Sequence, residues 1–448
     1  MEPMQELNKN DYGEIKTSNK KCLIILIVSI VIVIIAVVVI LYFALRSSDE
    51  STSSSGITYT TTVSGTSLSF NTVNLIKEDT EITSGTYEST SADQNVFLVV
   101  DGATLTLGPD VQITKTGSNS SKRRLTEEPP EPPSDGGEGG DAPDQPGGGG
   151  GQGGNSDDSY SFYGLNSAIV VIGEGSKAVI NGVTVTTNAY GANAVMAVNA
   201  GQIEIKNSTI RTSKGASRGL HATYTGKITA SDVDIATEGQ SCANLATDRG
   251  EGTVIAKNMK LSTAGAGSPL IYSTGDIQVT NATGTASGAQ MTVVEGKNSV
   301  ILKDCVFTCT GSGNRGDVDL AGVMIYQSMS GDASVGVGNF EAYNSDLQII
   351  DSDVSSSVPF FFVTNAEATV ILSDTTTTVK SGVFLNATGT EEWGTVGSNG
   401  GTVTMTVKGQ KFSGKVSTDD ISSVVINYDS SMTENDFTYE GNVTLSEL

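Results

Sequence analysis

The stretches AVMAVNAGQIEIKNSTIRTS (194–213), GLHATYTGKITASDVDIATE (219–238) and ANLATDRGEGTVIAKNMKLST (243–263) share one plan, and that plan decides the fold. Each begins with an apolar triplet, passes through a polar or glycine-containing turn, and continues as an alternating strand such as QIEI, KITA or TVIA. An Asn or Asp corner follows, and then a second strand rich in Val, Ile and Thr. Three short strands in each unit are typical of a stack of β coils.

The plan recurs along the chain roughly every 22 to 36 residues. PLIYSTGDIQVTNATGTAS (269–287) and PFFFVTNAEATVILSDTTTTV (359–379) repeat it, whereas a helical period and the pattern of leucine-rich repeats are absent. The corner positions are Asn207, Asp232, Asn258, Asn281 and Asp374. We therefore predict an all-β fold, a parallel β-helix (solenoid) of about eleven coils with Asn and Thr ladders along its corners.

An uncharged segment, CLIILIVSIVIVIIAVVVILYFAL (22–45), lies near the N-terminus and would be about 36 Å long as a helix. We interpret it as a transmembrane signal-anchor helix, because a cleaved signal peptide has a shorter apolar core. Lysines precede this segment and acidic residues follow it, so the positive-inside rule places residues 1–21 in the cytoplasm. The sequence therefore predicts a single-pass membrane protein with an extracellular or lumenal C-terminal ectodomain.

Two low-complexity stretches divide the predicted ectodomain. Residues 46–60 are rich in Ser and Thr and lack apolar periodicity, which predicts a flexible stalk. Residues 61–448 then form the predicted β ectodomain, and residues 118–159 interrupt it with Pro, Gly and acidic residues that cannot bury a core. We interpret the interruption as a disordered insert.

The formal net charge of −24, from 26 basic and 50 acidic residues, lies on the predicted ectodomain because the N-terminal tail is balanced. Such a surface repels nucleic acid and favours cations and neutral or basic partners. Four cysteines are too few for a disulfide scaffold of this size.

Over about residues 83–427 the sequence resembles adhesin-like surface proteins of gut Firmicutes, which look like right-handed parallel β-helices. The resemblance implies a right-handed helix displayed at a cell surface, and it implies no particular activity. The stretches that carry it are TDRGEGTV (from Thr247), SPLIYSTGDI (from Ser268), VVEGKNSV (from Val293), GVMIYQSMSGDA (from Gly322), FFVTN (from Phe361), EWGTVGSNGGTVT (from Glu392) and ISSVVI (from Ile421).

No catalytic set is evident in the sequence. Enzymes on this scaffold that cleave acidic polysaccharides need carboxylates with a nearby His, or an acid cluster with a basic residue. The chain has one histidine, His221, which we interpret as a structural residue facing the surface. Asp419 and Asp420 are adjacent and would point to opposite faces of a strand, unless they sit in a turn.

Three aromatic residues are candidate ligand contacts. Trp393, the single tryptophan, lies in a Gly-rich stretch beside Glu391 and Glu392, where an exposed indole would stack on a sugar and the carboxylates would bind hydroxyls. The alternative is that Trp393 folds back to cover the surface. Tyr272 and Tyr326 recur at matching points of their repeats, but a shift of one residue in strand register would place them in the core.

Weaker patterns indicate calcium binding and glycosylation. Asp317 and Asp319 lie two apart in a Gly-rich insertion, where they would share a calcium ion or form a solvated acidic loop. No other cofactor is expected. Asn-x-Ser/Thr sites, which permit N-glycosylation of a lumenal or extracellular chain, begin at Asn119, Asn207, Asn281, Asn386 and Asn442.

The function that these patterns favour is non-enzymatic: a membrane-anchored, surface-displayed β-helix for adhesion or extracellular binding of a glycan or surface protein. The alternatives are a polysaccharide lyase or hydrolase on the same scaffold, and a passive surface spacer. A single face of the β-helix that carries several acidic and aromatic residues would indicate a binding site. A face without such residues would indicate a passive, solvated surface.

Overall fold

Nearly all described elements of the computed structural model are strands. The chain divides into the units Met1–Ser55 and Gly56–Leu448, and every described residue belongs to the second. Within the described part, the helices are α2 (Asp157–Tyr163) and the 3-10 helix η1 (Glu434–Asp436), so the predicted all-β class is confirmed. The structure describes residues 56–120, 157–310, 314–315, 318–319, 321–328, 336–350 and 357–448.

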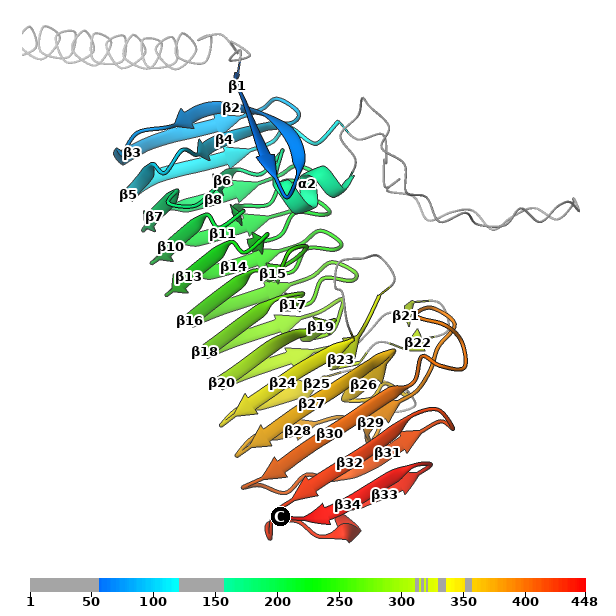
Figure 1. Ribbon diagram of the computed structural model, residues 1–448. Coiled ribbons are helices and arrows are strands. Elements are labelled where there is room, and N and C mark those ends of the chain that lie inside the picture. The colour runs from blue at the N-terminus through cyan, green and yellow to red at the C-terminus, as the bar shows by residue number, and fades with distance from the viewer. Residues whose placement is uncertain are drawn as a thin grey trace, which may run out of the picture. The chain divides into compact units, whose positions relative to one another are not determined.

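One sheet, called sheet 1 below, has 14 strands in the described part, and successive repeats contribute neighbouring strands (Figure 1). Its first pair, β1 and β2, is antiparallel, and the later pairs are parallel. In order the strands are β1 (Ile57–Val63), β2 (Thr66–Ile76), β4 (Gln94–Val99), β6 (Ile169–Ile172), β9 (Val195–Val198), β12 (Leu220–Thr223), β15 (Leu245–Thr247), β17 (Ile271–Ser273), β19 (Thr292–Glu295), β23 (Val323–Tyr326), β26 (Phe361–Thr364), β29 (Val383–Ala387), β31 (Gly414–Thr418) and β33 (Phe437–Glu440).

Among the described residues the second sheet, called sheet 2, has 18 strands, and its pairings are parallel. Its strands in chain order are β3 (Thr80–Ser89), β5 (Thr104–Lys115), β7 (Lys177–Asn181), β8 (Thr184–Thr187), β10 (Gln202–Lys206), β11 (Thr209–Thr212), β13 (Lys227–Ser231), β14 (Asp234–Thr237), β16 (Thr253–Thr263), β18 (Asp276–Ala286), β20 (Asn298–Cys309), β24 (Val337–Tyr343), β25 (Asp346–Ile349), β27 (Ala366–Ser373), β28 (Thr376–Thr378), β30 (Gly401–Lys408), β32 (Ser423–Tyr428) and β34 (Val443–Glu447). A separate antiparallel pair joins β21 (Asn314–Arg315) to β22 (Val318–Asp319).

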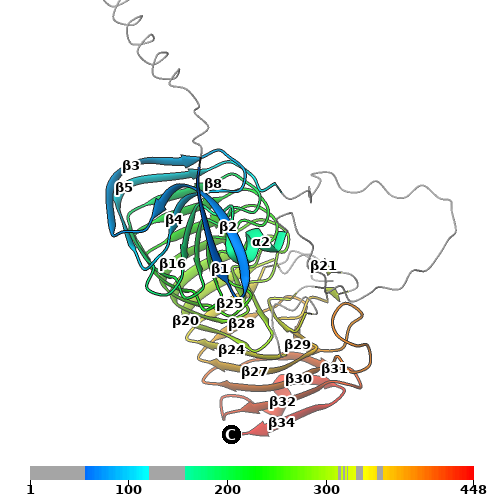
Figure 2. The same cartoon turned by 45° about the horizontal axis from the view of Figure 1, so that its top comes forward.

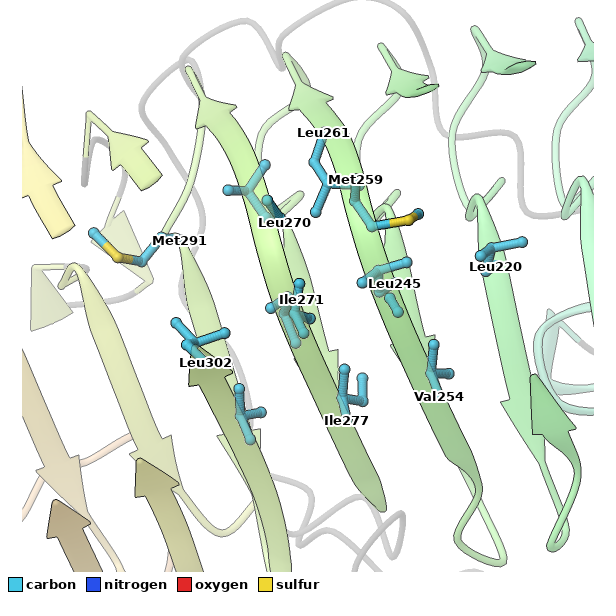
Figure 3. Packing of buried hydrophobic residues seen from close by; sticks show 14 of the residues in the cluster. Leu220, Leu245, Val254, Met259, Leu261, Leu270, Ile271, Ile277, Met291 and Leu302 are labelled. Carbon is cyan, nitrogen blue, oxygen red and sulfur yellow. The ribbon is translucent and has the colours of Figure 1, made fainter. Parts of the chain in front are cut away.

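The two sheets share one apolar core. Leu220, Leu245 and Ile271 occupy the same register position in successive strands of sheet 1 and point into this core, as Figure 3 shows. Strands of sheet 2 such as β10 alternate between buried and exposed residues, as expected for a sheet with one solvated face. Strands of sheet 1 from β4 to β26 are instead buried on both faces, apart from the half-buried Tyr272 of β17, so the outer side of sheet 1 must also be covered.

The corner residues predicted from the repeats adopt the left-handed conformation, with φ of 57° at Asp232, 55° at Asn258 and 53° at Asn281. Asn and Asp tolerate this region better than other residues with a Cβ. Asn258 Nδ2 donates to Asp232 Oδ1 at 3.0 Å, and Asn281 Nδ2 donates to Asn258 Oδ1 at 2.8 Å. The predicted corner ladder is therefore present.

The prediction of a right-handed parallel β-helix of about eleven coils is wrong. Parallel pairings instead close a ring of eight strands, and the antiparallel pairs make the arrangement mixed. The ring closes because β5 and β16 run unbroken past the corner, and each of them pairs with two short strands. Around the ring the order is β5, β7, β10, β13, β16, β14, β11 and β8.

The prediction of a single-pass membrane protein with an N-terminal transmembrane helix is also corrected. Among the described residues, no helix is long and apolar enough to cross a membrane. The segment on which the prediction was based, residues 22–45, lies outside the described residues, as do the tail 1–21 and most of the stalk.

Two predicted boundaries shift in the structure. Strand β1 begins at Ile57, inside the predicted stalk, because ITYT alternates and pairs with β2. Helix α2 begins at Asp157, inside the predicted insert, where Tyr160 and Phe162 bury their rings. Residues 121–156 of the insert lie outside the described residues.

Helix α2 and the β1–β2 hairpin cover the first part of the outer face of sheet 1. Phe70 of β2 and Tyr160 of α2 join one cluster with Leu98, Val170 and other outward residues of sheet 1. Figure 2 shows α2 beside β2 on this side. Further along sheet 1 a different segment covers the outer face. The candidate site lies at that segment.

The corner ladder generates a stability prediction. Asn258→Ala adds the left-handed strain of about 1–2 kcal/mol and removes side-chain hydrogen bonds worth about 1 kcal/mol each. Asn258→Gly removes only the hydrogen bonds, because glycine tolerates φ > 0. Urea denaturation should rank stability as wild type, then Gly, then Ala. An alanine variant as stable as wild type would show that the corner does not constrain the fold.

Candidate functional site

The loop between β29 and β30 carries Trp393. The indole is 5% exposed, and its centroid lies 5.0 Å from that of Tyr326 at an interplanar angle of 61°. Asn399 Nδ2 holds the loop by donating to Thr390 O at 2.5 Å and to Trp393 O at 2.6 Å. Trp393 therefore folds back onto sheet 1, which is the second of the two alternatives that the sequence left open.

Tyr272 and Tyr326 lie on the outer face of sheet 1, not in the shared core. Both hydroxyls donate to Oε2 of Glu295, Tyr326 at 3.0 Å and Tyr272 at a shorter distance. Burial, together with Tyr326 and Glu295 nearby, raises the pKa of Tyr272 well above its usual value. Trp393 packs over this group with Met324 and other apolar neighbours. The structure therefore brings together three of the five predicted ligand residues.

Glu295 was missed in the sequence because nothing local distinguishes it. It ends an apolar strand, VVE, and meets Tyr326 only through the register of β19 with β23. Its Oε1 atom is buried and has no hydrogen-bond partner in the structure. The pairing of Glu295 with two tyrosines across strands could be found only once the register is known.

A shallow groove of about 350 Å³ lies on the other side of the Trp393 loop. One wall is the loop itself, and the other is the turn that follows β31. We call it the acidic groove, and its lining residues are Gly389, Thr390, Glu391, Val396, Gly397, Asn399, Asp419, Asp420 and Ile421. Of the two predicted glutamates, Glu391 lines this groove and Glu392 does not, although both are exposed.

Asp419 and Asp420 lie in a turn and not on a strand. The opposite orientation expected for adjacent residues of a strand therefore does not apply to them. Asp419 Oδ2 accepts from Gly389 N at 2.8 Å and from Thr388 Oγ1 at 3.2 Å, so it fastens the two walls together. Partial burial raises the pKa of Asp419, but the hydrogen bonds from Ser422, Gly389, Thr388 and Ile421 outweigh it and lower the pKa below its usual value. Asp419 is therefore ionised and already hydrogen-bonded to the protein, whereas Asp420 is exposed.

The floor of the groove consists of Gly389 and Asn399. A Cβ on Gly389 would lie 2.8 Å from Asn399 Oδ1 and 2.8 Å from Ile421 Cδ1, so the groove requires glycine here. Asn399 is 1% exposed, and its Oδ1 has no hydrogen-bond partner in the structure. A buried acceptor of this kind normally has a donor, from the protein, water or a ligand. This oxygen is enclosed by the protein and is not exposed to the groove.

The groove presents acceptors and apolar surface, with no basic side chain among its lining residues. Val396 and Ile421 are 68% and 42% exposed, so the groove also presents apolar surface to solvent. Carboxylates beside them favour a ligand that donates hydrogen bonds, and they repel anions. The arrangement suits binding of a hydroxylated or cationic small group.

A second polar cluster lies under α2 on the same face of sheet 1. His221 is fully buried, so the prediction that it faces the surface is wrong. Its Nε2 lies 3.7 Å from Asp248 Oδ2, and Arg218 lies 3.4 Å from the same oxygen. Burial, with Arg218 nearby, lowers the pKa of His221 well below its usual value. Arg249 stacks on Phe162 of α2, so this cluster fastens the helix to the sheet.

The structure describes no calcium site at the predicted ligands Asp317 and Asp319. Asp317 lies outside the described residues, and Asp319 ends the short strand β22, where only the backbone is described. Among the described residues, no three His, Cys, Asp or Glu side chains are grouped to hold a metal ion. Calcium at Asp317 and Asp319 stays a prediction.

The predicted glycosylation sites differ in their surroundings. Asn207 and Asn281 lie on the corner ladder, where each Nδ2 donates to a neighbouring Asn. Asn386 Oδ1 accepts from Ser417 on the outer face of sheet 1, Asn442 lies in an exposed turn, and Asn119 is half-buried. Glycosylation of Asn207 or Asn281 would therefore break a ladder bond, and modification at any of the five stays a prediction.

Comparisons with protein-family models, curated proteins and solved structures find no match to this protein. The resemblance to adhesin-like surface proteins therefore stays a prediction.

The burial of Trp393 predicts its fluorescence. Because it is the only tryptophan in the sequence, emission of the native protein should be blue-shifted, weakly quenched by acrylamide, and shifted to the red on denaturation. Emission typical of a solvated indole in the native protein would contradict the packing on Tyr326.

The burial of His221 predicts a pH dependence of stability. Its folded pKa is depressed, so below the unfolded value of about 6.5 the unfolded chain binds the proton first. Stability should therefore be full above pH 6.5 and fall by up to about 1.4 kcal/mol per pH unit between about pH 6.5 and 5.5. His221→Gln should flatten this slope in urea titrations at each pH, whatever its effect at pH 8. An unchanged slope would refute the assignment.

Proposed function

We propose that the protein binds carbohydrate without cleaving it, in an adhesion-type role, and that the acidic groove holds the ligand. The observation that carries this proposal is the combination, in one groove, of exposed carboxylates and exposed apolar side chains. These are the features by which binding sites orient a hydroxylated ligand.

Each wall would contribute differently. Glu391 and Asp420 accept hydrogen bonds from hydroxyls of the ligand. Val396 and Ile421 contact the C–H face of a sugar ring, which replaces water on both surfaces. Gly389 allows Asn399 and Ile421 to pack closely beside it, since a Cβ there would lie 2.8 Å from an atom of each.

Trp393 acts through the loop and does not touch the ligand in this proposal. Its indole packs inward on Tyr326, while its backbone carbonyl binds Asn399, which forms the groove floor. Trp393 and Tyr326 are therefore positioning residues, and the Tyr272–Glu295 pair supports them from the sheet.

The alternative of a polysaccharide lyase or hydrolase needs a proton-donating or proton-abstracting group beside a polymer. The acidic groove has exposed carboxylates, but Asp419 is ionised and hydrogen-bonded to the protein, and no basic side chain lines the groove. Asp248 and Glu295 lie on one face of sheet 1, two strands apart, but their exposed fractions are 2% and 1%. The alternative of a passive spacer assigns no role to the groove. Binding in the acidic groove has the more specific support.

Two neighbouring glutamates provide a matched test of this function. Glu391→Gln should weaken binding to any oligosaccharide that a glycan array identifies by about tenfold or more, because a hydrogen bond to a charged group contributes about 1.5–3 kcal/mol. Asp420→Asn should behave in the same way. Glu392→Gln changes the net charge equally but lies outside the groove lining, so its affinity should match wild type.

Calorimetric titration of each purified variant provides the affinities. Equal weakening by the Glu391 and Glu392 substitutions would place the ligand elsewhere. Absence of binding to every sugar on the array would remove the carbohydrate proposal.

A further inference from the structure

Two tyrosines that are distant in sequence meet where helix α2 covers sheet 1. Tyr163 ends α2, and Tyr224 directly follows β12. Their rings lie nearly parallel, with centroids 5.3 Å apart and an interplanar angle of 4°. The Tyr224 hydroxyl donates to the Tyr163 hydroxyl at 3.2 Å. Because the two oxygens are closer together than the two centroids, the rings meet along the edges that carry the hydroxyls.

The surrounding structure holds this pair in place. Tyr224 N donates to Arg249 O at 2.8 Å, which fixes the backbone of Tyr224 in the stack of repeats. A Cβ on Gly250 would lie 2.5 Å from Tyr224 Cδ1, so Gly250 packs directly against the ring. The Tyr163 hydroxyl donates to Thr66 Oγ1 of β2 at 3.4 Å. The pair therefore lies where α2, sheet 1 and the β1–β2 hairpin come together.

The environment of the two phenols favours oxidation by loss of a hydrogen atom. Both side chains are half-buried, so each keeps an edge within reach of a small oxidant. Burial, together with the hydrogen bond to Tyr163, raises the pKa of Tyr224 well above its usual value of about 10. Tyr224 therefore keeps its proton at neutral pH, and an electron leaves it together with that proton.

We infer that Tyr163 and Tyr224 form a modification site, independent of the acidic groove, at which hydrogen peroxide and a haem peroxidase join the two rings as dityrosine. Each phenol loses one hydrogen atom, and these atoms reduce the peroxide to water. The unpaired electron of each ring is shared between the oxygen and the adjacent Cε carbons, so the two electrons pair in a Cε–Cε bond. The hydrogen on each bonded Cε then moves to the oxygen and restores the phenol. The bond fastens α2 covalently to sheet 1.

The test treats the full chain with hydrogen peroxide and a haem peroxidase and then analyses its tryptic peptides by mass spectrometry. Tyr224 lies in GLHATYTGK (219–227), which has no other tyrosine, and Tyr163 lies with Tyr160 in the peptide 125–177. We expect these peptides to be joined, with a mass lower than their sum by two hydrogen atoms, in a protein that runs as a single chain on a denaturing gel. The urea midpoint should rise, because the link closes a loop in the unfolded chain.

Three phenylalanine variants assign the link to its residues. Tyr163→Phe and Tyr224→Phe each keep the ring but lack the phenolic hydrogen, so each should abolish the joined peptides. Tyr160→Phe changes the same helix and the same tryptic peptide, and it should leave the link intact.

The unmodified sequence also provides a test that does not depend on how the variants fold. Peptides that stay separate in the wild-type protein, while the same reagents oxidise free tyrosine in a parallel mixture, would overturn the inference. A link that forms through Tyr160, or that survives in either variant of the pair, would overturn it as well.

Discussion

Sheet 1 is buried on both faces from β4 to β26, and much of the described structure depends on this constraint. The inner face packs against sheet 2 in one continuous core, as in an ordinary sheet pair. The outer face carries Leu98, Met196, Met324 and Phe362, whose exposure to water would be unfavourable. Cover is therefore required. Among the described residues, α2 and the β1–β2 hairpin supply it near the first strands, and the Trp393 loop supplies it further along.

The second cover, the Trp393 loop, also forms part of the proposed binding site. The indole of Trp393 seals the outer face over Tyr326, and the same loop turns back to form one wall of the acidic groove. Asp419 fastens this wall to the turn after β31, and Asn399 fastens the loop to itself. Groups that stabilise the cover also define the acceptors that a ligand would meet. The groove is thus a consequence of how sheet 1 is covered.

The apolar triplets and the Asn and Asp corners could be located from the sequence, because each reports a local requirement: burial in one case and a left-handed backbone in the other. The ring closed by β5 and β16 could not be located from the sequence, because no residue pattern shows that a strand continues past a corner. Trp393 and Glu391 were identified as candidate residues, but their opposite orientations depend on loop geometry. Glu295 and Asn399 became visible only through partners that are distant in sequence or through a missing partner.

The most direct measurement is a crystal structure of the protein grown with an oligosaccharide that the glycan array identifies. We expect the sugar to lie in the acidic groove between Glu391 and Asp420, with Trp393 still packed on Tyr326. A sugar bound to another face, or Trp393 turned outward to stack on the ring, would contradict the assignment of the acidic groove as the binding site.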